Sequence, residues 1–184
     1  MKKIVIILFI VISKIGFAQT NEKISMGGFG GPLIQMGKLN SSTLIWMGGG
    51  GGLIINHRYF IGGFGENSIS NVKANGIYSG SHLEIGHGGF WLGYIQKIGK
   101  RSNLFMSGQL GFGKSYQLKN EDKSYYTDYT IIKPCVEYEY VFTNYFKVGA
   151  GASYSYFNGA GLPSWSNNSL TGFNFILSFK FGWF

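Results

Sequence analysis

The residues that could carry out chemistry stand at spacings that do not let them act together. Ser81, His82 and Glu84 come closest to a nucleophile, a base and a carboxylate in series. In an extended strand, however, Ser81 points away from the face that His82 and Glu84 share, so a relay would need a bulge to assemble. We therefore expect no catalytic site.

Metal, phosphate and cofactor sites are no better supported. His82 and His87 lie five residues apart in one predicted strand and so point to opposite faces, while His57 falls in a predicted turn. The run Gly48–Gly52 is not followed by the Lys-Ser or Lys-Thr pair of a phosphate-binding loop, and the chain contains no complete G-x-G-x-x-G. The single cysteine, Cys135, excludes an internal disulfide and a cysteine-based zinc site. We expect neither a metal ion nor a cofactor.

The composition differs from that of a typical soluble domain. Hydrophobic residues make up 45% of the chain, aromatic residues 17% and charged residues 13%. An ordinary soluble domain has roughly 25% charged residues. The 30 glycines are accompanied by only 3 prolines, which is not the composition of a disordered or collagen-like chain. We expect one ordered domain that uses glycine heavily.

The N-terminus has the layout of a cleaved secretory signal peptide. Two lysines precede the apolar run 4–12, and Gly16 and Ala18 place small residues where signal peptidase acts. The nine apolar residues are well short of the about 20 that a membrane-spanning helix needs. We predict a signal peptide at 1–18 and one domain at 19–184, with the formal net charge lowered from +8 to +5. The remaining cations form no long run, so nucleic-acid binding is not expected.

Apolar and polar residues alternate with a period of two through the rest of the chain, which predicts strands throughout. In the segment 131–142, Lys133, Glu137 and Glu139 share one face, which cannot be in contact with hydrocarbon. In 171–184 the large apolar residues fall on one face, and small or polar residues, with Ile176 as the exception, fall on the other. The residues of this last strand that we predict to face lipid are Phe173, Phe175, Leu177, Phe179, Phe181 and Trp183.

Two structures fit this alternation: a soluble sheet with one wet face, and a transmembrane barrel with lipid outside and a polar interior. The polar face consists of glycine, serine and isolated charges, which are too small to form a solubilising surface. We therefore predict an all-β fold, an antiparallel eight-stranded transmembrane up-and-down β-barrel. The predicted strands are 26–37, 43–55, 59–70, 82–97, 103–117, 129–142, 145–157 and 171–184, with a bulge at Gly88–Gly89. Short turns at 56–58, 98–102 and 143–144 alternate with longer loops at 71–81, 118–128 and 158–170.

Charged residues on the inward face of such a barrel must pair or cost several kcal/mol each. The predicted cluster of charges in the lumen consists of Lys133, Glu137, Glu139, Lys147 and Lys180. The interior of an eight-stranded barrel is just wide enough for side chains to fill. We therefore expect an ion-pair network that fills the lumen, with a gated ion path as the alternative.

The signal peptide, the eight alternating strands and the C-terminal segment SFKFGWF together resemble the small outer-membrane β-barrel proteins of Gram-negative bacteria, the OmpA/OmpX-like group. The resemblance extends over 20–184 and rests on pattern rather than on an exact motif. It implies an outer-membrane location, contact with outer-membrane lipid, and recognition of the terminal Phe184 by the barrel-assembly machinery. Lys180 and Gly182 stand where the family has lipid-facing residues, and Trp183 takes that phase instead.

The expected function is a structural or surface-interaction role of a monomeric outer-membrane barrel, without catalysis. The loops 118–128 and 158–170, the second of which contains Trp165, have compositions suited to binding a surface protein or glycan. The same compositions suit solvated loops whose aromatic residues rest among lipid headgroups. A narrow ion channel, an enzyme that modifies lipid A and a soluble exported β-protein remain as alternatives.

Overall fold

The fold is known from a computed structural model, which describes residues 24–39, 42–70, 72–73, 81–119 and 122–184. The predicted signal peptide, 1–18, lies outside the described residues, as does most of the predicted loop 71–81. Among the described residues, no helix is long and apolar enough to cross a membrane.

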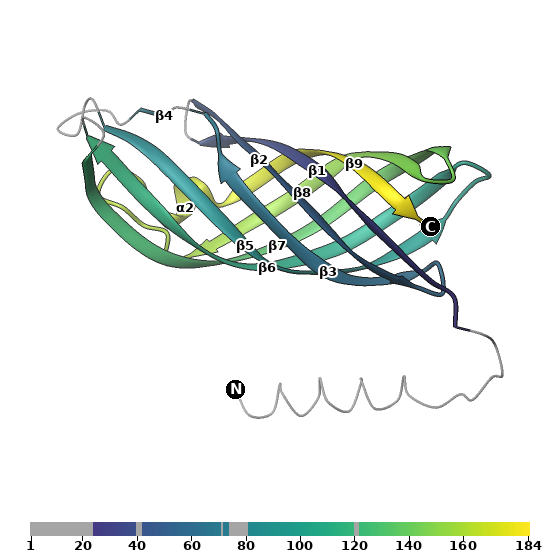
Figure 1. The fold of residues 1–184 in the computed structure, drawn as a ribbon. Helices are drawn as coiled ribbons and strands as arrows, with labels where there is room; N and C mark the ends of the chain where they lie inside the picture. The colour runs from purple at the N-terminus through teal and green to yellow at the C-terminus, as the bar shows by residue number, and fades with distance from the viewer. Residues whose placement is uncertain (1–23, 40–41, 71, 74–80, 120–121) are drawn as a thin grey trace.

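Eight long strands and one short one make up a single antiparallel sheet in the described part of the chain (Figure 1). The strands are β1 (Met26–Leu39), β2 (Ser42–Ile55), β3 (Tyr59–Ser68), β4 (Val72–Lys73), β5 (Ser81–Lys97), β6 (Ser102–Lys119), β7 (Asp122–Thr143), β8 (Phe146–Asn158) and β9 (Gly172–Trp183). Neighbours in sequence pair with one another, except that β3 pairs directly with β5, and β1 pairs with β9 to close the sheet. This confirms the predicted all-β fold, a closed antiparallel eight-stranded up-and-down barrel.

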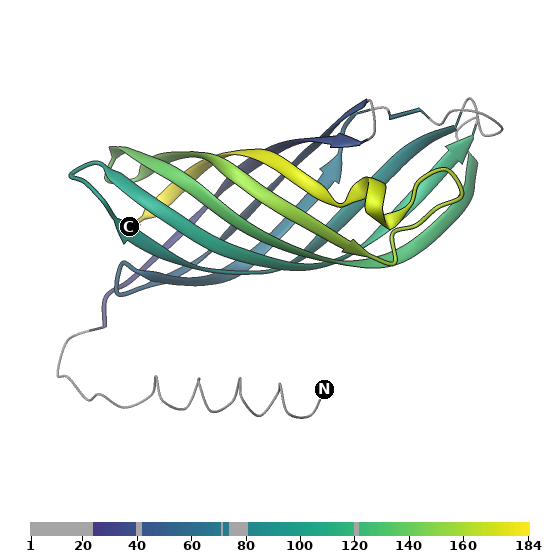
Figure 2. The same cartoon turned by 180° about the vertical axis from the view of Figure 1, so that it is seen from behind.

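The two ends of the barrel differ, as Figures 1 and 2 show. Short turns join β2 to β3, β5 to β6 and β7 to β8 at the end where the C-terminus lies, which we call the turn end. In the first of these turns Asn56 and His57 adopt positive φ angles of 51° and 54°, the backbone twist that suits a tight hairpin. The two longer connections, from β3 to β5 and from β8 to β9, lie at the opposite end, the loop end, where β2 also follows closely on β1 and β7 on β6.

The prediction of a loop at 118–128 is wrong for most of this range. Strand β6 continues to Lys119 and β7 begins at Asp122, so the two strands form a long hairpin in which Tyr116 pairs with Tyr126. The hydrogen bonds that pair two strands are made by the backbone. Where water reaches both faces of a hairpin, its strands can therefore form without alternating apolar and polar side chains. The polar composition therefore resembled that of a loop.

The predicted bulge at Gly88–Gly89 is also wrong, because the register of β5 against β6 runs without interruption through Gly88↔Phe112 and Gly89↔Gly111. The alternation looks broken in the sequence because Phe90 points outward and Trp91 inward, so that both faces are aromatic at this level. The register shifts occur instead between Gln117 and Leu118, and between Val141 and Thr143.

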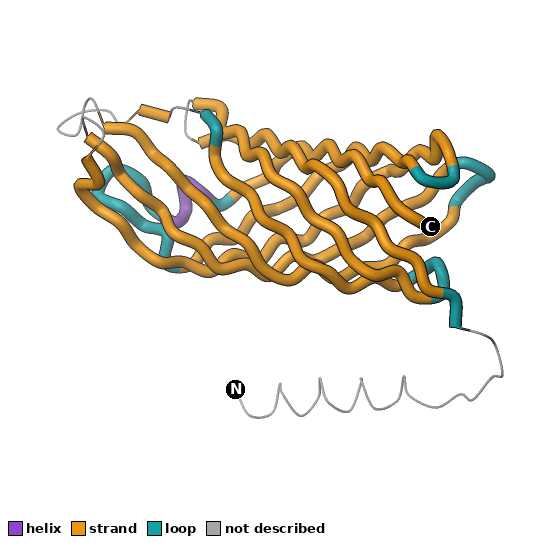
Figure 3. Tube along the Cα trace, viewed as in Figure 1, coloured by secondary structure: helices purple, strands orange, loops and turns teal. Residues whose placement is uncertain are grey.

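The loop 158–170 folds over the loop end of the barrel. It contains the short helix α2 (Asn167–Leu170), capped by Ser166, and Figure 3 shows this helix within the outline of the strands. Trp165 is only 4% exposed and joins a buried cluster with Leu162 and Leu170. Trp165 is therefore part of the packed interior and not of the surface that the composition of the loop suggested.

Two apolar clusters occupy the interior, one toward each end. The cluster at the loop end contains Leu39, Leu44, Trp46, Val72, Leu83, Ile85, Tyr129, Ile131, Phe157, Ala160, Leu162, Trp165 and Leu170. The cluster at the turn end contains Phe29, Leu33, Ile54, Phe60, Phe64, Trp91, Ile95, Phe105 and Ile176. Inward glycines make room for the large rings: a Cβ atom at Gly50 would lie 2.9 Å from the Trp91 ring.

A matched pair of glycine substitutions tests this packing. Gly50→Ala should lower the free energy of unfolding by about 1–3 kcal/mol, because its methyl group meets the buried Trp91 ring. At the outward-facing Gly65 a Cβ atom meets nothing closer than 4.0 Å. Gly65→Ala should therefore be neutral or stabilise by up to about 1 kcal/mol. Urea unfolding in lipid vesicles measures both, and equal effects would contradict the packing.

Candidate functional site

Strands β3, β5 and β7 bring three titratable side chains together in the middle of the barrel, and we call these the Glu66 cluster: Glu66, His87 and Lys133. The Lys133 ammonium lies 2.6 Å from Glu66 Oε2 and 3.4 Å from His87 Nε2. His87 Nε2 is also 3.4 Å from Glu66 Oε2. Glu66 and His87 are register partners on adjacent strands, so the sheet itself places them opposite each other.

Hydrogen bonds extend the Glu66 cluster to further strands. Gln35 of β1 donates to Glu66 Oε1 at 2.5 Å and accepts from Ser153 of β8 at 3.0 Å. The Tyr129 hydroxyl donates to the Gly86 carbonyl at 3.1 Å and lies 3.0 Å from His87 Nδ1. This hydroxyl therefore accepts from Nδ1–H, which leaves Nε2 of a neutral imidazole to accept from Lys133. Strands β1, β3, β5, β7 and β8 are thus linked through one network.

A second group, the Lys180 cluster, consists of Lys180, Glu137 and Glu139. The Lys180 ammonium lies 2.6 Å from Glu139 Oε1 and 3.4 Å from Glu137 Oε1. Ser178 donates to Glu137, and Asn103 donates to Glu139 at 3.3 Å. The ammonium also lies 3.2 Å from the ring centroid of Phe105, which gives it a cation–π contact.

Glycines on the intervening strand make the Lys180 cluster geometrically feasible. Strand β8 separates β7 from β9, and Glu137 and Glu139 are paired there with Gly151 and Gly149. A Cβ atom at Gly149 would lie 2.5 Å from Glu137 Oε2. The two glutamates can therefore reach Lys180 across a strand that carries no side chain at these positions.

All five residues of the predicted lumen cluster lie inside the barrel and are buried, between 0% and 6% exposed. Four of them form ion pairs, divided between the two clusters. The structure does not bring Lys147 into either cluster: its ammonium lies 3.7 Å from the ring centroid of Phe184, and no ion pair of Lys147 is found among the described residues.

The buried charges balance over the described interior. The buried carboxylates are those of Glu66, Glu137 and Glu139, and the buried ammonium groups are those of Lys133, Lys147 and Lys180. With His87 neutral, three negative charges face three positive charges. Five of the six groups form ion pairs, which limits the cost of taking them out of water. Lys147 is the exception among these buried groups, because it has no such pair.

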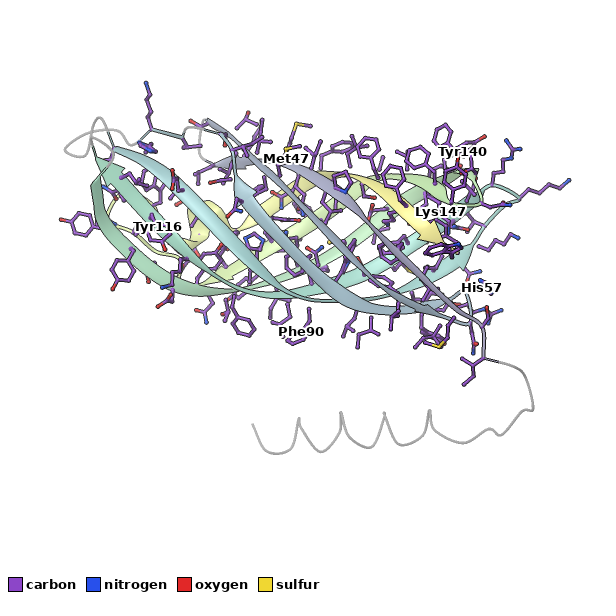
Figure 4. The ribbon with its side chains drawn as sticks, in the orientation of Figure 1. Met47, His57, Phe90, Tyr116, Tyr140 and Lys147 are labelled. Carbon is purple, nitrogen blue, oxygen red and sulfur yellow. The ribbon has the colours of Figure 1, made fainter. Side chains whose placement is uncertain are left out.

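The outer surface has the opposite character. In β9, Phe173, Phe175, Phe181 and Trp183 point outward and are 48–82% exposed. Leu177 and Phe179 lie on the same face and are half-buried. Large apolar side chains are exposed in the same way on every long strand, and Figure 4 shows Met47 and Phe90 projecting from the barrel wall.

The residues considered for catalysis and metal binding do not assemble. Ser81 is buried, His82 half-buried and Glu84 exposed, as their alternation in β5 requires. His57 lies in its turn, 2.8 Å from the Ser25 hydroxyl. Within the described ranges, no group of three His, Cys, Asp or Glu side chains could hold a metal ion.

The sequence prediction missed Glu66 and His87 as members of the charged interior. Glu66 has the same inward phase as Phe60 and Phe64, and this alternation is the signal that could have identified it. From the sequence, His87 is considered only as a metal ligand and is not placed among the charges of the lumen. Its inward position follows once the bulge at Gly88–Gly89 is removed, because it then keeps the phase of Trp91.

Breaking the Glu66–Lys133 pair should be costly. Lys133→Met should lower the free energy of unfolding by about 3–5 kcal/mol because it leaves the Glu66 carboxylate buried without its cation. The double variant Glu66→Gln with Lys133→Met should recover part of this loss. As a control, Lys114→Met removes the exposed Lys114–Asp128 pair, with its 3.7 Å separation, and should cost no more than about 1 kcal/mol. Equal costs for Lys133→Met and Lys114→Met in urea unfolding would contradict a stabilising role of the Glu66 cluster.

No protein-family model matches this sequence, and no curated protein matches it. Solved structures match the fold. Neisserial surface protein A aligns with a TM-score of 0.61 at 12% identity, over 88% of this chain and 98% of its own. Ail, the attachment invasion locus protein of Yersinia pestis, aligns with a TM-score of 0.54 at 10% identity, over 88% and 99%. Ail in complex with the heparin analogue sucrose octasulfate aligns with the same TM-score and identity. The chain therefore has the fold of the small eight-stranded outer-membrane β-barrels of the OmpA/OmpX-like group.

Proposed function

We propose that this protein is a monomeric integral outer-membrane barrel that acts at the cell surface through its loop end and does not conduct ions through its lumen. The observation that carries the proposal is the inverted polarity of the barrel. Charged side chains lie buried inside, and large apolar side chains stand exposed outside on every long strand. A protein in water has the reverse arrangement, whereas a barrel in a bilayer has this one.

The size of the exposed apolar surface supports a lipid environment. Phe173, Trp183 and Phe90 are 77%, 82% and 62% exposed, and contiguous apolar surface on this scale marks contact with a membrane or a partner. The long strands have 10 to 22 residues, enough for the ~9–11 residues that a tilted strand needs to cross a bilayer. Outer-membrane lipid is therefore the proposed neighbour of the whole outer face.

The turn end would face the periplasm, because bacterial barrels carry short turns there and longer loops outside. Export by the signal peptide 1–18 and insertion by the barrel-assembly machinery belong to this proposal. Phe184 packs partly buried against the apolar cluster at the turn end, which leaves Trp183 as the last outward aromatic residue.

The side chains buried inside the barrel support a lumen that is closed to ions. The Glu66 and Lys180 clusters cross-link strands on different sides of the barrel, and an apolar cluster lies toward each end of it. An eight-stranded barrel has little interior space beyond what its side chains occupy.

The β6–β7 hairpin supports a surface-interaction role. Tyr125 and Tyr126 are 47% and 66% exposed, and the Lys114 ammonium lies 5.9 Å from the Tyr126 ring centroid. Figure 4 shows Tyr116 at this same loop end. Exposed tyrosines with nearby charges suit the binding of a protein or a glycan. The similar structures include a surface protein and an attachment protein, the second also solved with a heparin analogue.

Fractionation followed by electrophoresis tests the membrane assignment. The protein should be found in the outer-membrane fraction, and samples kept cold in SDS should migrate differently from boiled samples because the folded barrel resists the detergent. Recovery in the soluble periplasmic fraction, without a shift on boiling, would overturn the assignment and make the outer aromatic residues a buried interface or a ligand cavity.

Recording ion conductance in planar bilayers distinguishes a barrel that is closed to ions from a narrow channel. The buried charges are compatible with either. The reconstituted protein should give no steady single-channel steps, because the side chains of the two clusters occupy the interior. Protein denatured by boiling is the control for leakage caused by detergent. Reproducible, unitary conductance steps from folded protein would replace the closed barrel with the channel.

A further inference from the structure

The mouth of the barrel at the turn end contains a hollow of about 290 Å³. Its polar lining comes from His57 of the β2–β3 turn, Lys97 and Lys100 near the β5–β6 turn, Asn103 of β6, Asn144 of the β7–β8 turn and Lys147 of β8. Figure 4 shows Lys147 and His57 at the end of the barrel where Figure 1 marks the C-terminus. The hollow is therefore built by turns that are far apart in the sequence.

Positive charge dominates this mouth. Among the residues that line it, three are lysines and none is Asp or Glu, so that the carboxylate of the lining is the chain-terminal one of Phe184. Arg58 and Arg101 are exposed in the adjoining described turns, which likewise carry no acidic side chain. The buried Glu139 is in direct contact with Lys180, at 2.6 Å, and accepts a hydrogen bond from Asn103, so it acts on Lys147 only electrostatically and forms no ion pair with it. At the loop end, by contrast, exposed cations and acids are mixed, as in the Lys114–Asp128 pair.

Lys147 is the second observation that points to a ligand. Lys147 is only 6% exposed. Its ammonium group contacts the ring of Phe184 and not a carboxylate. The Glu139 carboxylate acts on this ammonium electrostatically, but no ion pair of Lys147 is found among the described residues. An ammonium that is buried without an anion in direct contact is costly. An anion in the hollow would reduce that cost, and Lys97 and Lys100 at the rim would add charge-assisted hydrogen bonds.

We propose that this mouth binds an oxyanion of the phosphate class, held by the ammonium groups of Lys97, Lys100 and Lys147. Lysine acts as a point-charge donor to phosphate. The phosphate could come from a small soluble ester or from the headgroup of an anionic phospholipid in the leaflet beside the turns. The lipid source rests on the proposed membrane function, whereas the soluble source does not.

The test uses the full exported chain, refolded in amine-oxide detergent micelles, which contain no phosphate. Inorganic phosphate is titrated at constant ionic strength, and binding is followed through backbone amide chemical shifts of the turn residues. In a second arm, native mass spectrometry counts the lipids retained from vesicles of phosphatidylcholine alone or mixed with phosphatidylglycerol. The rim variant is Lys97→Gln with Lys100→Gln. The control, Lys38→Gln with Lys114→Gln, removes the same charge from exposed lysines outside the mouth.

The rim variant should bind inorganic phosphate, or retain phosphatidylglycerol, at least about tenfold more weakly than wild type and the control, as expected for hydrogen bonds to charged groups. Saturable phosphate binding identifies a soluble source, and selective retention of phosphatidylglycerol alone identifies a headgroup. Equal behaviour of wild type, rim variant and control in both arms would overturn the site. Lys147→Met provides a second variant with the same expectation. Migration of cold and boiled samples in SDS, recorded for each variant, distinguishes loss of the site from loss of the barrel.

Discussion

Charges buried inside the barrel are costly unless an opposite charge lies beside them, and the rest of the structure depends on this constraint. Three carboxylates and three ammonium groups occupy the interior. If the strands shifted so that an ion pair among these groups separated, an uncompensated ion would stay buried, which is costly. Each ion pair therefore constrains the strands that carry its members. The Glu66 cluster and its hydrogen bonds join five strands, and the Lys180 cluster joins β7 to β9 across β8. The clusters therefore favour a single register for most of the sheet.

Glycine and large side chains complement each other in meeting this constraint. Gly149 and Gly151 leave space on β8 for the glutamates that reach Lys180, and Gly50 leaves space for the ring of Trp91. The heavy use of glycine is thus a consequence of a narrow interior that holds long charged and aromatic side chains. The same interior leaves Lys147 in a basic mouth with the Phe184 ring as its neighbour, which gives the turn end a character that the loop end lacks.

Much of the fold could be predicted from the sequence, because period-two alternation is a local signal that survives wherever one face of a strand is polar. The alternation of β7, β8 and β9 gave both the strands and the inward charges. The alternation is not a clear signal in β5, because Trp91 points inward and Phe90 points outward, so that both faces of the strand carry an aromatic residue. His87 was therefore missed. Glu66 stands alone among aromatic residues and glycines in β3, and its partners come from distant strands. The burial of Trp165 depends on how the loop folds over the barrel, which spacing along the chain does not encode.

The most direct test of the inverted polarity uses the four tryptophans. Trp46, Trp91 and Trp165 are at most 4% exposed inside the barrel, whereas Trp183 is 82% exposed on its outer face. Fluorescence of the protein in vesicles of lipids with brominated acyl chains should be quenched through Trp183 alone, and Trp183→Phe should abolish the quenching. If strong quenching persists in Trp183→Phe, an interior tryptophan is in contact with lipid, and the arrangement of charges inside and apolar residues outside is wrong.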